Sequence, residues 1–196
     1  MGIVTRGFGG RRQADPHVPP GQYVTEDFPV LSTGPTPNVD ETSWTLEVRT
    51  ETGVVHHWDW AGLTALPAED VTTDIHCVTH WSKLGTTWRG VSVDTLLGDV
   101  ETSADFVVAH SFGGYTTNVP LEDLTDGRAW IAYEFEGEPL DPVHGGPARL
   151  LVPHLYFWKS AKWVRELELT VQEDLGFWEV NGYHAYGDPW LEQRYA

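Results

Sequence analysis

The stretch that decides the fold is DIHCVTHWSKL, residues 74–84. It contains Cys77, the only cysteine of the 196-residue chain, with His76 and His80 close by. The apolar and β-branched residues of Val71–Thr79 predict a strand that runs into Cys77. The thiol is therefore expected at or near a strand end, either as a buried, inert side chain or as the centre of a site.

Several kinds of chemistry are open to this cysteine. A thiolate forms at neutral pH only beside positive charge or a metal, and His76, His80, Lys83 and Arg89 can supply positive charge. Cys77 is then a soft metal ligand, a nucleophile paired with a histidine, or with His80 half of a zinc site. The zinc site is disfavoured because the chain has no second cysteine. The nucleophile remains unspecific, because no spacing in the sequence indicates which histidine would pair with Cys77.

The charge of the chain is strongly negative, at −17. Such a chain repels nucleic acids and anionic lipids, so neither is an expected partner. Three windows nevertheless contain no Asp or Glu: residues 75–93, 106–121 and 142–165. The third holds four of the twelve basic side chains: Arg149, Lys159, Lys162 and Arg165. These windows predict an anion site, and the alternative is that each base pairs with a carboxylate distant in sequence.

Outward from Cys77 the chain indicates strands and only short helices. Alternation in Trp44–Arg49 and in Val54–Trp60 predicts a hairpin. Val93–Leu97 predicts one or two helical turns that begin near Ser92 or Asp94, and Leu121–Leu124 predicts a helical turn. Further strands are expected at Phe106–Ala109, Trp130–Phe135, Leu150–Val152 and Trp163–Val171, the last of them half exposed. The predicted fold class is therefore α+β, strand-rich and mixed, in one domain.

The chain ends and the location are predicted from composition. Residues 1–24 are expected to be a loose N-terminal arm and residues 25–196 a single domain. No stretch approaches the roughly 20 apolar residues of a membrane span. Arg11–Arg12 is similar to the start of a twin-arginine export signal, but polar and proline-rich residues follow instead of an apolar region. We therefore expect a cytoplasmic protein.

Two further segments could bind a ligand. HSFGGYTT, residues 110–117, offers two glycines for close approach of the backbone, together with several hydroxyl groups. The alternative is a plain hairpin turn. HGGPARLLVPHLYFWKSAK, residues 144–162, combines a tight turn, Arg149 and a Lys-Ser-Ala-Lys cluster. These groups suit a phosphate or another anionic head group, and the alternative is a solvated basic patch.

Together the segments resemble the sulfite oxidase superfamily of molybdopterin-dependent oxidoreductases, from about residue 25 to the C-terminus. HCVTHWSK, GGYTTNVPLED and GGPARLLVP with KSAKWV follow one another in family order and at family-like spacing. The closing GFWEVNGYH and GDPW resemble the compact bacterial branch, which includes the catalytic subunit of methionine-sulfoxide-reducing systems. The resemblance implies the fold of the sulfite oxidase molybdopterin-binding domain. It also implies a molybdenum–molybdopterin cofactor in its mononucleotide form.

The resemblance also implies the site residues. The metal ligand is Cys77, because in the family one cysteine thiolate binds molybdenum. The expected cofactor contacts are Cys77, Phe28, Pro29, His110, Ser111, His144, Arg149, Ser160, Ala161 and Lys162. Arg149 and Lys162 would neutralise the phosphate. His76 and His80 are expected to line the substrate pocket and to act as catalytic residues beside Cys77, with Trp81 a further candidate.

The function expected from the resemblance is oxygen-atom transfer on a small molecule such as a sulfoxide, an N-oxide or sulfite. The chain leaves no room for a haem domain, so no haem is expected. We expect a separate electron-transfer partner instead. Two alternatives remain open: a protein that binds or carries the cofactor without turnover, and a metal-free thiol enzyme. The C-terminal aromatic residues could bound a pocket or an interface, and the favoured alternative is that they pack the arm against the domain.

Overall fold

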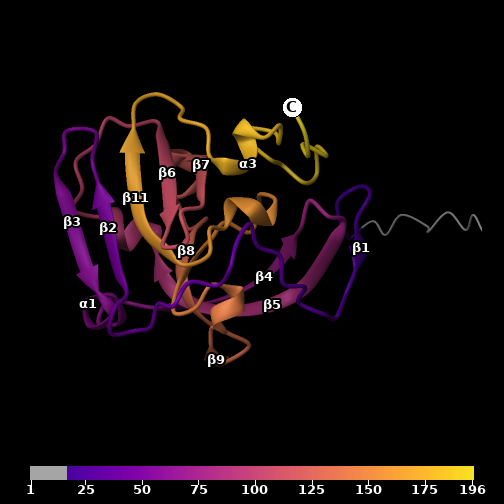
Figure 1. Ribbon diagram of the computed structural model, residues 1–196, viewed down its shortest axis with the longest axis horizontal. Coiled ribbons are helices and arrows are strands. Elements are labelled where there is room, and N and C mark those ends of the chain that lie inside the picture. Colours follow the sequence, from indigo (N-terminus) through magenta and orange to yellow (C-terminus); the bar gives the residue numbers. More distant parts are fainter. Residues whose placement is uncertain (1–16) are drawn as a thin grey trace, which may run out of the picture.

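The computed structural model describes residues 17–196 and contains two β-sheets (Figure 1). One sheet has the order β3-β2-β11-β6-β7. The other has the order β1-β5-β8-β10, with β4 paired to β5 and β9 to β8. The strands are β1 (Tyr23–Val24), β2 (Thr45–Arg49), β3 (Val55–Asp59), β4 (Glu69–His76), β5 (Trp81–Ser92), β6 (Phe106–Ser111), β7 (Thr116–Pro120), β8 (Trp130–Phe135), β9 (Glu138–Pro139), β10 (Arg149–Leu151) and β11 (Val164–Thr170).

Helices are few and short. They are α1 (Trp60–Thr64), α2 (Val93–Leu97), α3 (Phe177–Val180) and the 3₁₀ turns η1 (Leu121–Asp123), η2 (Pro142–His144) and η3 (Phe157–Lys159). The strand-rich mixed fold class expected from the sequence is therefore confirmed. Among residues 17–196, none of the helices has the length and apolar character that crossing a bilayer requires.

The core has two parts that share strands β8 and β10. One cluster joins the two sheets and includes Leu167 of β11 with Ile131 and Leu150. The other lies on the opposite side of the same strands and includes Leu151 together with Cys77. Because alternate side chains of a strand point to opposite faces, β8 and β10 are buried on both faces. This burial explains their nearly continuous apolar sequence.

Many of the predicted elements are confirmed with small shifts. The hairpin is the antiparallel pair β2–β3, and Val93–Leu97 is α2, which Ser92 caps through its side chain. The predicted second strand ends earlier, at Asp59, whose carboxylate accepts a 2.7 Å hydrogen bond from the Gly62 N–H and starts α1. The strand expected to be half exposed, β11, lies between β2 and β6 and is mostly buried.

The longest strand, β5, was not predicted. Its sequence WSKLGTTWRGVS is interrupted by two glycines, which usually weaken a strand. Both are required by the fold: Gly85 has φ +61°, and a Cβ on Gly90 would lie 2.5 Å from the Ile131 carbonyl oxygen. Strand β5 pairs with β4 on one side and β8 on the other. It thereby fixes the Cys77 region to the sheet.

The structure describes only part of the N-terminal arm expected at residues 1–24. Residues 1–16, which include Arg11–Arg12, lie outside the described residues. In the remainder of the expected arm, residues 17–24, Val18 is buried and the backbone of β1 pairs in parallel with β5, while Tyr23 and Val24 are exposed. Gln22 also donates a 2.9 Å hydrogen bond to the Cys77 carbonyl oxygen.

Candidate functional site

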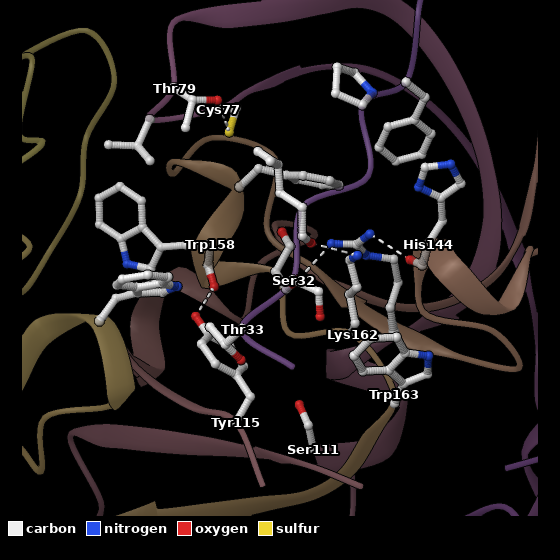
Figure 2. A pocket seen from close by; sticks show the side chains of 18 of the residues that line it. Ser32, Thr33, Cys77, Thr79, Ser111, Tyr115, His144, Trp158, Lys162 and Trp163 are labelled. Carbon is white, nitrogen blue, oxygen red and sulfur yellow. Dashed lines mark hydrogen bonds between the residues drawn. The ribbon is translucent and has the colours of Figure 1, made fainter. Parts of the chain in front are cut away.

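The site is a cavity of about 350 Å³ that the second core cluster partly encloses (Figure 2). Thirteen of its twenty lining residues come from the three acid-free windows, and no Asp or Glu is among the twenty. The fold thus brings the three windows together around one hollow. The lining residues are Phe28, Pro29, Leu31, Ser32, Thr33, Cys77, Val78, Thr79, Trp81, Ser111, Tyr115, His144, Arg149, Phe157, Trp158, Ser160, Lys162, Trp163, Trp178 and Tyr183.

Cys77 follows the last residue of β4 and lies in a tight turn. Its N–H donates to the Trp81 carbonyl, and its own carbonyl accepts from the His80 N–H at 3.0 Å. His80 adopts φ +77° to close this turn. The Cys77 Sγ lies 3.1 Å from the Thr79 Oγ1. Burial raises the pKa of the Cys77 thiol, and the bond to Thr79 acts in the opposite direction.

Arg149 is the central cation of the site and is almost completely buried. Its guanidinium donates to the carbonyl oxygens of His144 at 2.7 Å and Ser160 at 2.6 Å, and it lies 4.1 Å from the ring centroid of Phe157. Among residues 17–196, no carboxylate forms an ion pair with Arg149. Burial lowers the pKa of Arg149 to about 9.

Lys162 is the second cation. Its ammonium donates to the Leu31 and Val143 carbonyl oxygens, each at 2.7 Å. Burial and then the charge of Arg149 lower the pKa of Lys162 to about 8. Two cations that repel one another, held by neutral carbonyl groups and aromatic rings, are a preorganised site for an anion.

The other two bases of the third window are paired with carboxylates. The Lys159 ammonium lies 2.6 Å from the Glu179 carboxylate, and both side chains are fully buried. Arg165 lies 3.9 Å from its neighbour Glu166. The alternative of a remote carboxylate is therefore correct for Lys159, and only Arg149 and Lys162 remain available to a ligand.

Three buried polar atoms on the cavity wall have no hydrogen-bond partner among the described residues. They are the Ser111 Oγ, the His144 Nδ1 and the Trp81 Nε1. Since buried polar groups are nearly always satisfied, these atoms point to a ligand with several donors and acceptors. The Ser160 hydroxyl, which accepts from the Val152 N–H at 2.9 Å, still has its own proton to donate.

The strap, residues 25–33, forms one wall of the cavity. Phe28 stacks on His144 with ring centroids 3.8 Å apart and an interplanar angle of 8°. Burial, then Arg149 and Lys162, lower the pKa of His144 to about 4, so this ring is neutral at pH 7. Figure 2 shows Cys77 and Thr79 on one side of the cavity and Ser111 on the opposite side. Ser32 and Thr33 lie between the two sides.

Most of the cofactor contacts expected from the sequence lie around this cavity. Phe28, Pro29, Cys77, Ser111, His144, Arg149, Ser160 and Lys162 all line it. Ala161 does not, because its side chain packs into the core that joins the sheets. His110 points elsewhere and pairs with Glu168 on β11 at 2.9 Å.

The two histidines flanking Cys77 do not reach the cavity lining. The His76 Nδ1 lies 2.8 Å from the Ser82 Oγ, with the ring edge-on to Trp190. His80 is exposed, and its Nδ1 lies 2.9 Å from the Gly21 carbonyl oxygen. Strand alternation explains the position of His76: it is the last residue of β4, so its side chain faces away from that of Cys77.

Some lining residues had no clear signal in the sequence. Ser32 and Thr33 belong to a proline-rich stretch without periodicity, and only the structure shows it crossing the cavity. Thr79 could have been found, because a hydroxyl two residues after a cysteine in a turn can reach its sulfur. Trp178 and Tyr183 stack on one another at 4.7 Å and line the cavity, so these two of the C-terminal aromatic residues bound a pocket.

Comparison with known proteins identifies the family. Residues 33–178 match the oxidoreductase molybdopterin-binding domain. The chain is 45% identical to the uncharacterized oxidoreductase YuiH of Bacillus subtilis, over 96% of this chain and 98% of that protein. It is 28% identical to a putative protein-methionine-sulfoxide reductase subunit, YedZ1, of Azospira oryzae, over 86% of this chain and 66% of that protein.

More distant relatives are longer than this chain. Mouse mitochondrial sulfite oxidase is 26% identical over 86% of this chain, but over only 38% of its own length. The sulfane dehydrogenase SoxCD of Paracoccus pantotrophus has the same fold, with a TM-score of 0.62 and 19% identity over 70% of this chain and 40% of that one. The domain match and the close Bacillus relative together show that this chain belongs to the family of oxidoreductases with a molybdopterin-binding domain.

Proposed function

We propose that this oxidoreductase transfers an oxygen atom to or from a small molecule such as a sulfoxide, an N-oxide or sulfite, with Cys77 as the protein ligand to molybdenum. The observation that carries the proposal is one cavity with a thiol on its wall and two cations, Arg149 and Lys162, that lack carboxylate partners among the described residues. The relatives named for sulfite and methionine sulfoxide support this class of reaction.

The cavity residues fit the cofactor that the family binds. A thiolate is a soft ligand suited to molybdenum, and a pterin offers ring nitrogens and amides to the unpaired atoms of Ser111, His144 and Trp81. Arg149 and Lys162 would hold the phosphate of the mononucleotide form, with Ser160 donating its hydroxyl proton. When bound, the cofactor supplies two-electron redox chemistry, and the protein orients it and excludes water.

The substrate would bind on the Cys77 side of the cavity, among aromatic side chains. Trp178 and Tyr183 pack on the cluster that contains Cys77 and Val78. Rigid apolar rings bind neutral groups with apolar substituents well. Within the reaction class, this wall favours a sulfoxide or an N-oxide over the sulfite anion.

Two accessory properties belong to the same proposal. The second half-reaction would use a separate electron-transfer partner, and the YedZ1 relative is likewise named as a subunit of a reductase. We also propose a cytoplasmic location, because a chain with a single cysteine has no intrachain disulfide of the kind that an oxidising compartment favours.

Metal and cofactor analysis tests the proposal. Protein from a host with molybdenum and pterin should contain about one molybdenum atom per chain, and Cys77→Ser should lose it. Holoprotein should reduce a sulfoxide or N-oxide with a reduced dye as donor. If the protein purified from that host contains no molybdenum, and alkylation of its thiol abolishes its activity, it is a thiol enzyme instead. Bound cofactor without turnover of any acceptor would identify a carrier.

The phosphate clamp is tested separately. Arg149→Ala should release the cofactor faster than the wild type does. The dissociation rate of Arg149→Lys should lie between those of Arg149→Ala and the wild type, because lysine keeps the charge but loses the fork geometry of the guanidinium. An unchanged dissociation rate in Arg149→Ala would show that Arg149 is not a phosphate ligand. The matched control is Arg165→Ala, since Arg165 is a half-exposed base of the same window.

A further inference from the structure

The C-terminal arm, residues 171–196, carries an unusual share of exposed apolar side chains. Of the thirteen exposed large hydrophobic residues in the described chain, six lie between residues 175 and 195. Trp190 is 52% exposed and Leu191 is 68% exposed. Single exposed apolar residues are ordinary, but such a concentration on one short segment is typical of an interaction surface. In Figure 1 the arm is the yellow segment that ends at the C-terminus.

The exposed charges of the arm are all negative. Glu173, Asp174 and Glu192 are exposed, whereas the only Lys or Arg of the arm, Arg194, is buried. The guanidinium of Arg194 points inward and donates to the Val78 carbonyl oxygen at 2.7 Å. Apolar side chains with acidic neighbours match a partner that has an apolar centre and a basic rim.

The arm also contacts the residue next to the proposed metal ligand. The indole of Trp190 lies edge-on to the His76 imidazole, with centroids 6.3 Å apart and an interplanar angle of 77°. His76 is 5% exposed and is joined to Cys77 by one peptide bond. A short covalent and aromatic path therefore connects the cavity wall to an exposed indole. This position accounts for a buried histidine that does not reach the cavity.

We propose that the C-terminal arm is the docking surface for a basic one-electron carrier protein, and that electrons pass between Cys77 and the carrier through His76 and Trp190. The inference rests on the proposed oxygen-atom transfer for its two-electron half-reaction. Two successive carriers each exchange one electron, so the two electrons given up or taken by the substrate are accounted for. The proton that accompanies each electron is exchanged with water.

Charge decides between this occupant and others. A second copy of the chain would bring the same acidic arm against Glu173, Asp174 and Glu192, and like charges in an interface disfavour association. An anionic lipid surface is repelled in the same way. A basic protein is attracted over a Debye length of about 8 Å at physiological salt, so its association should weaken as the salt concentration rises.

Binding is tested with the holoenzyme and a basic c-type cytochrome as the probe, by calorimetry at low salt. Glu192→Lys should weaken binding at least fivefold, and Glu101→Lys, which changes an exposed acid outside the arm by the same charge, should leave it unchanged. An acidic ferredoxin should not bind. Equal effects of the two substitutions, equally tight binding of ferredoxin, or a dimer that buries the arm would each overturn the docking surface.

The electron path is tested at saturating cytochrome by stopped-flow spectroscopy. Trp190→Leu should slow electron transfer within the complex about tenfold or more, whereas Trp190→Phe should keep more of the rate because it retains an aromatic ring. An unchanged rate in Trp190→Leu would overturn the path. Dye-driven turnover of the wild-type enzyme is measured in parallel. If that turnover is absent, the proposed function fails, and if it is present without cytochrome binding, only the docking surface fails.

Discussion

At the scale of single residues, the hydroxyl of Thr79 is the polar group that contacts the sulfur of Cys77 and opposes the effect of burial on its pKa. Its Oγ1 is 3.1 Å from the Sγ, in a turn that also buries the thiol. Thr79→Val keeps the shape and removes the hydrogen bond, so the pKa of the thiol should rise in cofactor-free protein. Alkylation of Cys77 near neutral pH should then slow about fivefold, since a hydrogen bond contributes about 1 kcal/mol.

The control for Thr79 is Thr79→Ser, which retains the hydroxyl and should alkylate at nearly the wild-type rate. In the loaded enzyme, Thr79→Val should also change the electron paramagnetic resonance signal of the half-reduced metal, because hydrogen bonds to a ligand sulfur tune the metal. Alkylation of Thr79→Val as fast as that of wild type would mean that the hydroxyl does not donate to the sulfur.

His144 predicts how acid destabilises the cofactor-free protein. Its pKa is near 4 when folded and about 6.5 when unfolded, so between these values only the unfolded chain binds the proton. The stability from this residue is therefore complete above pH 6.5 and is lost as the pH falls towards 4. His144→Phe keeps a ring against Phe28 but does not titrate. Urea midpoints should consequently fall less steeply over this window in the variant.

The decisive measurement is the difference between the two slopes. All other titrating groups are shared by the two proteins, so their effects largely cancel. Parallel acid limbs for wild type and His144→Phe would contradict a neutral, partly buried His144.

Individual residues also show how far the sequence could lead. Cys77, Arg149 and Lys162 lack acidic neighbours in the chain, and the structure places all three around one cavity. Lys159 has the same sequence signal, yet it pairs with Glu179, twenty residues away. Pairing across the fold depends on which strands are neighbours, and no local pattern in the sequence carries that information.

At the scale of elements, the buried pair Lys159–Glu179 anchors the C-terminal arm. The Glu179 Oε1 also accepts from the Thr117 Oγ1 and the Trp158 Nε1, each at 2.9 Å. Glu179→Gln leaves the Lys159 charge without a counter-ion, and breaking a buried pair costs about 3–5 kcal/mol. We expect a loss of stability near that size, together with faster proteolysis within residues 171–196.

The matched control is Asp174→Asn, which neutralises an exposed acid on the same arm. It should change stability by less than about 0.5 kcal/mol. Equal proteolysis of the two variants would show that the ion pair does not hold the arm. Chemical denaturation and limited proteolysis measure the two effects independently.

Element prediction succeeded where local pattern and fold agree. Trp130–Phe135 and Val93–Leu97 match β8 and α2 because apolar periodicity and a serine cap specify them locally. Strand β5 was not predicted because its two glycines are required by the neighbouring structure. Gly85 adopts a positive φ, and Gly90 lies at a bulge where β8 comes close to the backbone. Such requirements arise from neighbouring strands, so a single sequence does not reveal them.

At the scale of the whole molecule, the site depends on segments that are far apart in the chain. The strap, the turn after β4, the β6–β7 hairpin and the segment around β10 and η3 all contribute walls. The resemblance gave this arrangement, whereas strand patterns alone gave only a strand-rich class. The burial of β8 and β10 on both faces ties the cavity to the main core, so a bound cofactor should stabilise the whole domain.

The strap has a consequence for how long the cofactor stays bound. The Phe28 stack on His144 and the bond from Lys162 to the Leu31 carbonyl hold its central part across the cavity, and Thr25 and Glu26 bond to β5 at its start. If a ligand can leave only after the strap lifts, residence time follows the opening rate rather than affinity alone. Phe28→Ala should therefore speed both loading and loss of the cofactor, measured by pterin fluorescence, with a smaller change in their ratio.

Val30→Ala is the matched control, because Val30 is an exposed strap residue that does not line the cavity. It should leave both rates unchanged. A faster loss without faster loading in Phe28→Ala would mean that the ring is only a binding contact. If both rates rise together, opening of the strap limits both binding and release of the cofactor. Insertion of the cofactor in the cell must then take place before the strap closes over the cavity.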